Sequence, residues 1–347
     1  MRACRRSAGT VKAAARGVAA AALALFAGAA AASDRSSAFE WTAMGTRIRL
    51  TVRGDDAERA GAAMAAAARL ALESVESETS AFRAESPLAL LRCAAGSGEW
   101  VEAGGHFAAA LDLALETAGE TDGAFNPLVA PFLEALGFAR RPPGVAKSGS
   151  EAPDVALLDL TKIERRPGAC RLALRGMALD FGGLAKGLGA DFAAAAARAA
   201  ATNEFLLDAG GTIVGRGAWR VGLRDPRGGT DAPPLAVFPL RDGIACATSG
   251  NYERFVKNAD GTAVGHIFDP RAATPAPGGA LQVTVFAPTA ARADALGTAL
   301  FVLGPGHCAA TIARHPECVA LFVLPAPDGG VNIASVGDAS KLEFQSE

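Results

Sequence analysis

The segment ALDFGGLAKGLGAD, residues 178–191, contains a short apolar run, a pair of glycines and an alanine-rich stretch. Within residues 178–183, this order predicts a strand that ends in Asp180 and passes through the glycine pair into a helix over about residues 184–201, with Lys186 in its first turn. Glycines at such a junction let the backbone approach a ligand, and the unpaired N–H groups of a first helical turn suit phosphate. The spacing matches neither GxxxxGK[ST] nor GxGxxG, so a plain tight turn is the alternative.

The sequence on both sides of this segment mixes strand and helix patterns. Alternating apolar residues predict an opening strand within residues 39–54, and further strands over residues 171–174, 204–207, 219–223, 236–239, 244–248, 282–286 and 318–324. Helices are predicted over residues 56–77, 106–118, 131–136, 290–303 and 307–315. Residues 140–153 are polar and contain proline, which indicates a surface loop. The mixture favours an α+β fold.

The predicted helix over residues 290–303, AARADALGTALFVL, places Asp294 and Thr298 four residues apart and therefore on one face. Both side chains offer hard oxygen atoms. Magnesium prefers a carboxylate with a few neutral oxygens, while it keeps other positions for phosphate and water. The alternative is that Asp294 caps a helix or interacts with its dipole.

Two further segments contain candidate ligand contacts. In GHIFDPRAATP, residues 265–275, His266 lies where a strand meets a turn, with Asp269 three residues later. A histidine there can serve as a general base or as a structural hydrogen-bond donor, and the spacing does not decide between the two roles. In LLDAGGTIVG, residues 206–215, a second glycine pair follows a strand and suits close contact with a flat ligand, with a β-turn as the alternative.

The first 33 residues have the three parts of a secretory signal peptide. Five basic residues precede an apolar run from about Gly17, and small residues follow at positions 30–33. A membrane anchor is the alternative, but a membrane-spanning helix needs roughly 20 apolar residues and this run has about 15. Cleavage is expected near Ala32 or Ser33, which predicts an exported mature protein of residues 34–347.

The composition narrows the class of protein. Half of the 347 residues are hydrophobic and a fifth are charged, which is enough to bury one large core or two smaller ones. Cleavage of the signal peptide leaves 29 of the 34 basic residues against 36 acidic ones, a net charge of about −7, so nucleic acid is not an expected partner. Five cysteines remain without metal-binding spacing, and Cys308 and Cys318 are close enough in sequence to form a disulfide.

Taken together, these segments resemble the FAD:protein FMN transferase family, also called the ApbE family. The resemblance extends over nearly the whole mature chain. The matching blocks are MGT at Met44, GAFNPLVAP at Gly123, ALDFGGLAKG at Ala178, LLDAGG at Leu206, TSGNYERF at Thr248, HIFDPRAATPA at His266 and APTAARADALGTALFVLG at Ala287.

The resemblance implies an α+β fold of two subdomains, each of mixed sheet and helices, with FAD in the cleft between them and Mg²⁺ beside its pyrophosphate. By position, Asp294, Thr298 and the backbone carbonyl of Gly183 match the metal ligands of the family. The positions that line the FAD site in the family are matched by Met44, Phe82, Ala124, Phe125, Asn126, Asp180, Lys186 and Ile267.

The resemblance also implies a reaction. A Thr or Ser hydroxyl of an acceptor flavoprotein, often a membrane-associated redox subunit, attacks the FMN phosphorus of FAD, and AMP leaves. Such a step depends on charge neutralisation and positioning, for which Mg²⁺ and Lys186 are suited. His266 is the best candidate to take the hydroxyl proton, with Asp294 as the alternative. Export places the enzyme in the periplasm or otherwise outside the cytoplasm.

Departures from the family pattern keep other functions open. Asn126 stands where many relatives have Asp, Phe82 where Tyr or Trp is common, and Ala291 where some relatives have an additional acidic ligand. One alternative is a Mg²⁺-dependent FAD pyrophosphatase, in which water replaces the acceptor hydroxyl. Another is a periplasmic flavin-binding protein without turnover. The intact residues Asp294, Thr298, Lys186 and His266 argue against the protein without turnover, whereas the pyrophosphatase would use the same site and differs from the transferase in its products.

Overall fold

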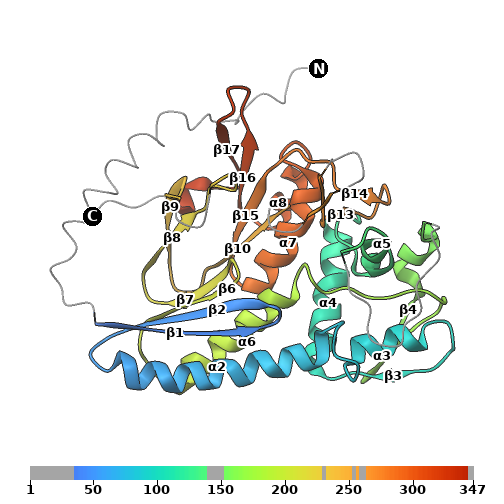
Figure 1. Cartoon of the computed structure of the whole chain (residues 1–347), viewed down its shortest axis with the longest axis horizontal. Helices are drawn as coiled ribbons and strands as arrows, with labels where there is room; N and C mark the ends of the chain where they lie inside the picture. Colours follow the sequence, from blue (N-terminus) through green and yellow to red (C-terminus); the bar gives the residue numbers. More distant parts are fainter. Residues whose placement is uncertain (1–34, 139–151, 229–231, 252–254, 258–262, 343–347) are drawn as a thin grey trace.

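The computed structural model describes residues 35–138, 152–228, 232–251, 255–257 and 263–342. The predicted signal peptide, residues 1–33, and most of the predicted loop over residues 140–153 lie outside these ranges. Strands β1 (Ser36–Ala43) and β2 (Thr46–Arg53) form an antiparallel hairpin (Figure 1). Its turn is left-handed, with φ of 51° at Met44 and 70° at Gly45. The single opening strand predicted for residues 39–54 was therefore wrong, because this turn divides it into two.

The largest sheet of the described residues has eight strands in the order β1-β2-β6-β7-β10-β15-β16-β17. Every neighbouring pair is antiparallel. As in every β-strand, alternate side chains point to opposite faces of the sheet. The other six strands are β6 (Phe205–Ala209), β7 (Thr212–Arg216), β10 (Ala245–Gly250), β15 (Gln282–Ala287), β16 (Val319–Pro325) and β17 (Val331–Val336).

Helices α2 (Ala57–Thr79), α6 (Ala185–Ala200) and α7 (Ala290–Leu303) cover one face of this sheet (Figure 1). The side chains between the layers form what we call the sheet core. Its fully buried members come from both layers: Ile48, Leu50, Met64, Leu72, Phe205, Leu207, Val283, Val285, Leu296, Leu300 and Phe322. Alanines fill most helix positions that face the strands, which lets the helices lie close to the sheet.

The opposite face of the sheet is covered by the hairpin of β8 (Trp219–Leu223) and β9 (Ala236–Leu240) and by the short helix η4 (Ala339–Leu342). Trp219, Val221 and Leu240 pack there against Cys246, Phe286 and Leu321 of the sheet. Short elements complete this part of the chain: β11 (Phe255–Lys257), β12 (Ala263–Gly265), β13 (Phe268–Asp269) and β14 (Thr274–Pro275), and helix α8 (Ala309–Arg314).

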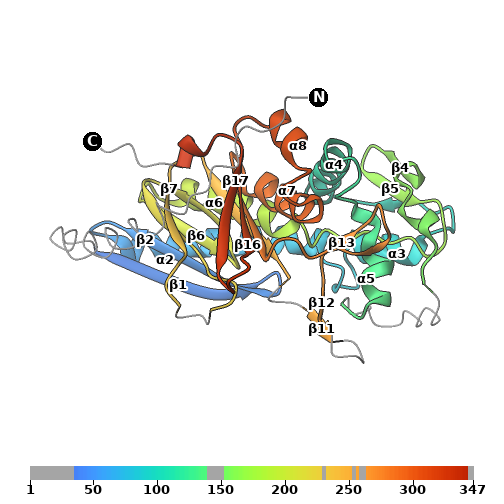
Figure 2. The same cartoon turned by 90° about the horizontal axis from the view of Figure 1, so that it is seen from above.

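A second group of elements lies to one side of α7, away from the large sheet (Figures 1 and 2). It contains α3 (Pro87–Ala94), α4 (Gly105–Glu120) and α5 (Ala130–Ala135), and a three-stranded sheet in the order β3-β5-β4. The strands are β3 (Val101–Glu102), β4 (Ile163–Arg166) and β5 (Ala169–Leu172), and the short helices are η1 (Pro127–Val129), η2 (Val155–Leu158) and η3 (Leu160–Lys162).

We call the core of this group the α4 cluster. Phe107 and Leu111 of α4 pack there against Leu128, Leu172 and other apolar side chains. Ala291, Ala295 and Ala299 of α7 belong to this cluster as well, so α7 contributes to both cores. The predicted α+β class is confirmed. That FAD binds between the two parts stays a prediction.

Other expectations were wrong in detail. Residues 178–183 are not a strand, because the N–H of Asp180 donates to the carbonyl of Pro127 in the short helix η1 rather than to a neighbouring strand. Cys308 and Cys318 are both buried in the sheet core and are free thiols, not a disulfide. In the described part of the chain, no helix is both long enough and apolar enough to cross a membrane.

Candidate active site

The first turns of α6 and α7 cross in direct contact. A Cβ atom on Gly187 would lie 2.3 Å from the backbone oxygen of Ala290 and 2.7 Å from the Cα of Ala291. Real side chains do not approach so closely, so only glycine permits this crossing. It brings Lys186, the second residue of α6, next to Asp294, the fifth residue of α7. Lys186 thus lies in the first helical turn, as predicted.

Asp294 is the central polar residue of this crossing, and its side chain is only 3% exposed. Its Oδ2 accepts a hydrogen bond from the N–H of Gly187 at 3.0 Å. The Nζ atom of Lys186 lies 3.3 Å from each carboxylate oxygen and also donates to the carbonyl of Gly182 at 3.4 Å. Asp294 therefore caps α6 from a neighbouring helix, so the capping role that the sequence left open is real but belongs to α6.

Two neutral oxygens lie near Asp294: the hydroxyl of Thr298, one turn further along α7, and the backbone carbonyl of Gly183. The Thr298 hydroxyl donates to the carbonyl of Gly183 at 3.4 Å. A Cβ atom on Gly183 would lie 2.9 Å from the Thr298 oxygen and 3.0 Å from the ring of Phe125, so a larger residue would fill this space. Gly183 is therefore needed for the close approach of backbone and hydroxyl.

The three predicted metal ligands present a donor set that fits Mg²⁺. A carboxylate, a hydroxyl and a backbone carbonyl are hard oxygen donors, and a magnesium site with one carboxylate leaves positions for water and phosphate. Within the described residues no group of three or more His, Cys, Asp and Glu gathers to hold a metal. With a single carboxylate, the donor set fits a metal that also binds a phosphate ligand.

Met44 is held in its left-handed conformation by α2. Its N–H donates to Oε2 of Glu76 at 3.2 Å, and the same carboxylate pairs with Arg83 at 3.3 Å. The Met44 sulfur would lie 2.6 Å from a Cβ atom on Gly189, so the side chain packs on the buried face of α6. The sequence did not predict a role for Glu76. Its role is visible only in the structure, where its carboxylate binds the N–H of Met44, whose backbone is strained.

The loop after α4 contains three of the predicted FAD-lining residues, and their side chains have structural contacts. Ala124 is buried in the sheet core and Phe125 in the α4 cluster. The oxygen of the Asn126 side chain accepts from the N–H of Leu128 at 2.8 Å, and its nitrogen donates to the carbonyl of Leu158 at 2.9 Å. Asn126 thus caps η1 and ties it to η2.

The other predicted contacts differ in exposure. Phe82 is 65% exposed, in the loop between α2 and α3. Asp180 accepts from the N–H of Gly182 at 2.6 Å, which shapes the glycine turn before α6. Ile267 is buried, and its N–H donates to Asn251 at 3.1 Å. His266 is half-buried, and its ring lies edge-on to that of Phe138, with centroids 6.3 Å apart.

Asp269, three residues after His266, is occupied by its own turn. Its carboxylate receives bonds from the N–H and guanidinium of Arg271 at 2.8 to 3.0 Å. Burial raises the pKa of Asp269, but the bonds from Arg271 outweigh burial and hold this pKa below its usual value. Asp269 is therefore a stable anion that fixes the turn after His266.

Asp191 is a residue for which the sequence indicated no role. Its Oδ1 accepts from the N–H of Ala290 at 2.8 Å, and its Oδ2 from the N–H of Ala291 at 2.9 Å. Burial raises the pKa of Asp191 to about 6; the two N–H bonds lower it and the nearby charge of Asp294 adds to the increase. The only sequence signal was its place at the end of the glycine-rich segment.

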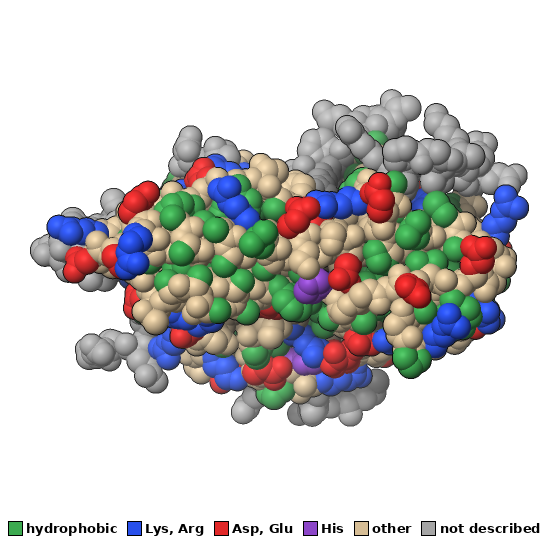
Figure 3. All heavy atoms as spheres, turned by 90° about the horizontal axis from the view of Figure 1, so that it is seen from below, with side chains coloured by type: hydrophobic (Ala, Val, Ile, Leu, Met, Phe, Trp, Pro, Cys, Tyr) green, Lys and Arg blue, Asp and Glu red, His purple; other side chains and the backbone are tan. Residues whose placement is uncertain are grey.

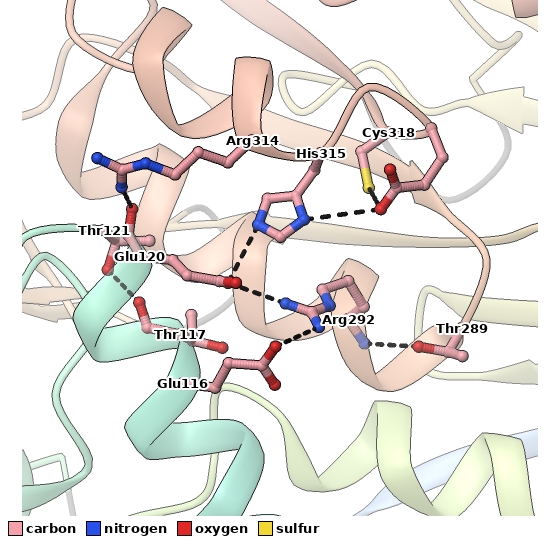
Figure 4. A network of polar contacts seen from close by, with 10 residues as sticks. Glu116, Thr117, Glu120, Thr121, Thr289, Arg292, Arg314, His315 and Cys318 are labelled. Carbon is pink, nitrogen blue, oxygen red and sulfur yellow. Dashed lines mark hydrogen bonds and ion pairs between the residues drawn. The ribbon is translucent and has the colours of Figure 1, made fainter.

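An ion-pair network joins the other side of α7 to α4 (Figure 4). The guanidinium of Arg292 contacts Glu116 at 2.8 Å and Glu120 at 2.9 Å. Nε2 of His315 lies 3.0 Å from Glu120, and Arg314 donates to the backbone oxygen of Glu120. The network thereby holds the end of α4, after which the chain turns into the loop of residues 124–126. Elsewhere, on the face shown in Figure 3, acidic and basic side chains lie interspersed.

The fold and this site define an α+β protein whose glycine turn, helix N-terminus, lysine and hard oxygen donors suit a phosphate ester. The chain belongs to the ApbE family, because the sequence profile of that family matches residues 44–322. The resemblance noted in the sequence is thereby confirmed.

Proteins similar to this chain agree with that assignment. The FAD:protein FMN transferase of Treponema pallidum is 33% identical over 280 residues, which cover 73% of this chain and 75% of that protein. The FAD:protein FMN transferase of Salmonella typhimurium is 28% identical over 305 residues, which cover 84% of this chain and 85% of that protein. The crystal structure of the ApbE protein from Thermotoga maritima has a TM-score of 0.75 and 26% sequence identity, covering 90% of this chain and 100% of that chain.

Proposed function

We propose that this chain transfers the FMN part of FAD to a Thr or Ser hydroxyl of an acceptor flavoprotein. The hydroxyl oxygen bonds to the FMN phosphorus, the pyrophosphate bond breaks, AMP leaves, and the hydroxyl proton passes to a base. Family membership and the names of the similar proteins support this reaction. The structural observation that carries it is the meeting of Lys186 and Asp294 at the crossing of two helix N-termini.

Some of the site residues would bind the pyrophosphate and others would bind the metal. Lys186 and the first turn of α6 offer positive charge and N–H groups to the pyrophosphate. Asp294, Thr298 and the carbonyl of Gly183 would hold Mg²⁺, which when bound neutralises the charge of the phosphate oxygens.

His266 is proposed as the base that takes the hydroxyl proton. Asp294 already accepts the N–H of Gly187 and pairs with Lys186, and its carboxylate is the proposed metal ligand. His266 is half-buried and belongs to a residue type that titrates near neutral pH. The flavin is proposed to lie beside this residue, near Met44, Phe82 and the loop of residues 124–126.

The protein is further proposed to act after export. The signal-peptide pattern of residues 1–33 supports a periplasmic location or another site outside the cytoplasm. The acceptor would then be an exported flavoprotein, such as a membrane-associated redox subunit.

The test is co-expression with candidate exported flavoproteins, followed by mass spectrometry of the denatured acceptor. A mass increase of one FMN on a Thr or Ser, absent with the Asp294→Asn variant, is the expected result. Release of free FMN and AMP without any labelled acceptor would identify a pyrophosphatase instead. Recovery of bound, intact FAD after prolonged incubation with Mg²⁺ would identify a flavin-binding protein without turnover.

A further inference from the structure

The carboxylate of Asp191 connects two helices at the site. It lies on α6, five residues after Lys186, and accepts the N–H groups of the first two residues of α7 at 2.8 and 2.9 Å. The first four N–H groups of a helix have no partner within it, and a negative charge at this end interacts favourably with the helix dipole. Asp191 therefore holds the start of α7 against the side of α6.

A second carboxylate makes the reciprocal connection. Asp294 lies on α7 and accepts the N–H of Gly187 in the first turn of α6. Together with the contact between Gly187 and Ala290, these bonds fix both the distance between the two helices and the rotation of α7. A rotation of α7 would carry the oxygens of Asp294 and Thr298 away from Lys186 and Gly183.

We propose that Asp191 is a positioning residue that sets the place of Asp294 and Thr298 for metal and phosphate. The inference rests on the proposed function, because it assumes that these two residues hold the metal. As a positioning residue, Asp191 does not contact the reacting atoms. It acts through the backbone of residues 290 and 291.

The hydrogen bonds at the start of α7 distinguish the positioning role of Asp191 from ordinary helix capping. Thr289 already caps α7 from within, since its hydroxyl accepts the N–H of Arg292 at 3.2 Å. Thr289 precedes α7 in the same chain segment. Asp191 instead ties the first turn of α7 to the helix that bears Lys186, and this tie keeps a carboxylate out of most of the solvent, which costs free energy. The half-buried carboxylate of Asp191 thus orients α7.

The test compares Asp191→Asn, Asp191→Glu and Thr289→Ala in the full mature chain with FAD bound. The amide of Asp191→Asn can accept one N–H but presents its NH₂ to the other, whereas Asp191→Glu keeps two acceptor oxygens. Residues that orient metal ligands typically cost 10- to 100-fold in metal affinity when replaced, and because Asp191 acts through the backbone we expect a loss of about tenfold for Asp191→Asn. Affinity is measured with Mn²⁺ by electron paramagnetic resonance, which needs no turnover.

Three readouts complete the experiment. Amide hydrogen exchange of residues 290–293 should accelerate in Asp191→Asn and recover in Asp191→Glu. FAD affinity should stay within about twofold of the parent, while the Mg²⁺ concentration for half-maximal rate rises about tenfold. Thr289→Ala should reduce Mn²⁺ affinity by no more than about threefold, since it leaves the tie to α6 intact.

The proposal is overturned if Asp191→Asn binds Mn²⁺ as tightly as the parent, or if Thr289→Ala weakens Mn²⁺ binding as much as Asp191→Asn does. If Asp191→Asn does not fold, Asp191→Ser, whose hydroxyl can accept one N–H without the charge, takes its place, and Mn²⁺ binding as tight as that of the parent or of Thr289→Ala overturns the proposal. A parent that binds Mn²⁺ but transfers no FMN would refute the proposed function and leave the inference about Asp191 testable.

Discussion

Asp191 of α6 and Asp294 of α7 each accept hydrogen bonds from the first turn of the other residue's helix. The N-termini of the two helices consequently lie together, and Lys186 adds its charge at the same place. Two helix ends and an ammonium group thus meet two carboxylates, so this place offers positive groups for a pyrophosphate and a carboxylate for Mg²⁺.

Replacement of Asp294 should abolish FMN transfer. Because this side chain is buried, Asp294→Ala would leave the N–H of Gly187 without a partner, so Asp294→Asn is the better variant. The amide oxygen can still accept that N–H, while the charge that would bind metal is lost. We expect a rate at least about 10²-fold lower with retained FAD binding, measured by single turnover and fluorescence titration. Undiminished transfer at limiting Mg²⁺ would remove Asp294 from the metal site.

His266→Ala should slow transfer by about 10² to 10⁴, the usual contribution of a positioned base, and leave FAD affinity nearly unchanged. The competing account is that His266 packs the turn against the flavin, as its contact with Phe138 allows. In that case FAD binding would weaken as much as transfer slows. Both quantities are measured on the same variant, and a loss confined to binding would exclude the catalytic role.

Gly187→Ala should destabilise the protein and weaken its metal binding, because the new Cβ would meet the backbone of Ala290 and push α7 away from α6. Overpacking of this kind costs about 1–3 kcal/mol. Gly119→Ala is the matched control, since this glycine is also helical and its Cβ would meet nothing within 4 Å. There we expect a gain of about 0.4–1 kcal/mol. Urea unfolding of both variants measures the two changes in the free energy of unfolding, which should have opposite signs. A Gly187→Ala protein as stable as the parent would contradict the close crossing of α6 and α7.

The ionisation of Asp191 should make stability depend on pH. The pKa of this carboxyl is raised from 3.8 to about 6 in the folded chain, so the folded state holds its proton more strongly than the unfolded state. The resulting stabilisation is present below about pH 4 and is lost as pH rises through 6, by up to about 3 kcal/mol. Asp191→Asn lacks this titration, although Asp294 and Arg198 remain beside the position. The unfolding free energy of the parent minus that of the variant should therefore fall between pH 4 and 7, and a constant difference would refute the raised pKa.

Export predicts the start of the mature protein. Envelope fractions should yield a chain that begins near Ser33 or Asp34, because the small residues before this point form the expected cleavage site. N-terminal sequencing or intact mass determines it. A chain from the same fractions that still begins at Met1 would contradict cleavage of the signal peptide.

Local signals in the sequence predicted several elements closely. Helix α7 has the predicted bounds Ala290–Leu303, because Thr289 caps its start and Gly304, with φ of 70°, follows its end. The spacing of Asp294 and Thr298 placed both on one helix, and the glycine pair marked the start of α6. These features are encoded in short stretches of the chain.

Other features depend on contacts between distant segments, and the sequence did not show them. The five-residue separation of Lys186 and Asp191 does not tell which helix lies next to Asp191. The need for glycine at position 187 arises only from the backbone of Ala290, about a hundred residues later. The apolar run before Asp180 resembled a strand, but the N–H of Asp180 donates to the carbonyl of Pro127 in η1 and not to a strand.

The membership of α7 in two cores has a consequence for folding cooperativity. Alanines of one face pack in the α4 cluster and leucines of the other pack in the sheet core, so neither core keeps its packing if this helix detaches. Segments that share a packed element tend to open together in native-state hydrogen exchange. The slowest amides of α4 and of β15 should therefore exchange with the same free energy of opening. The chain would then have no partly unfolded state in which one half is native and the metal ligands are lost.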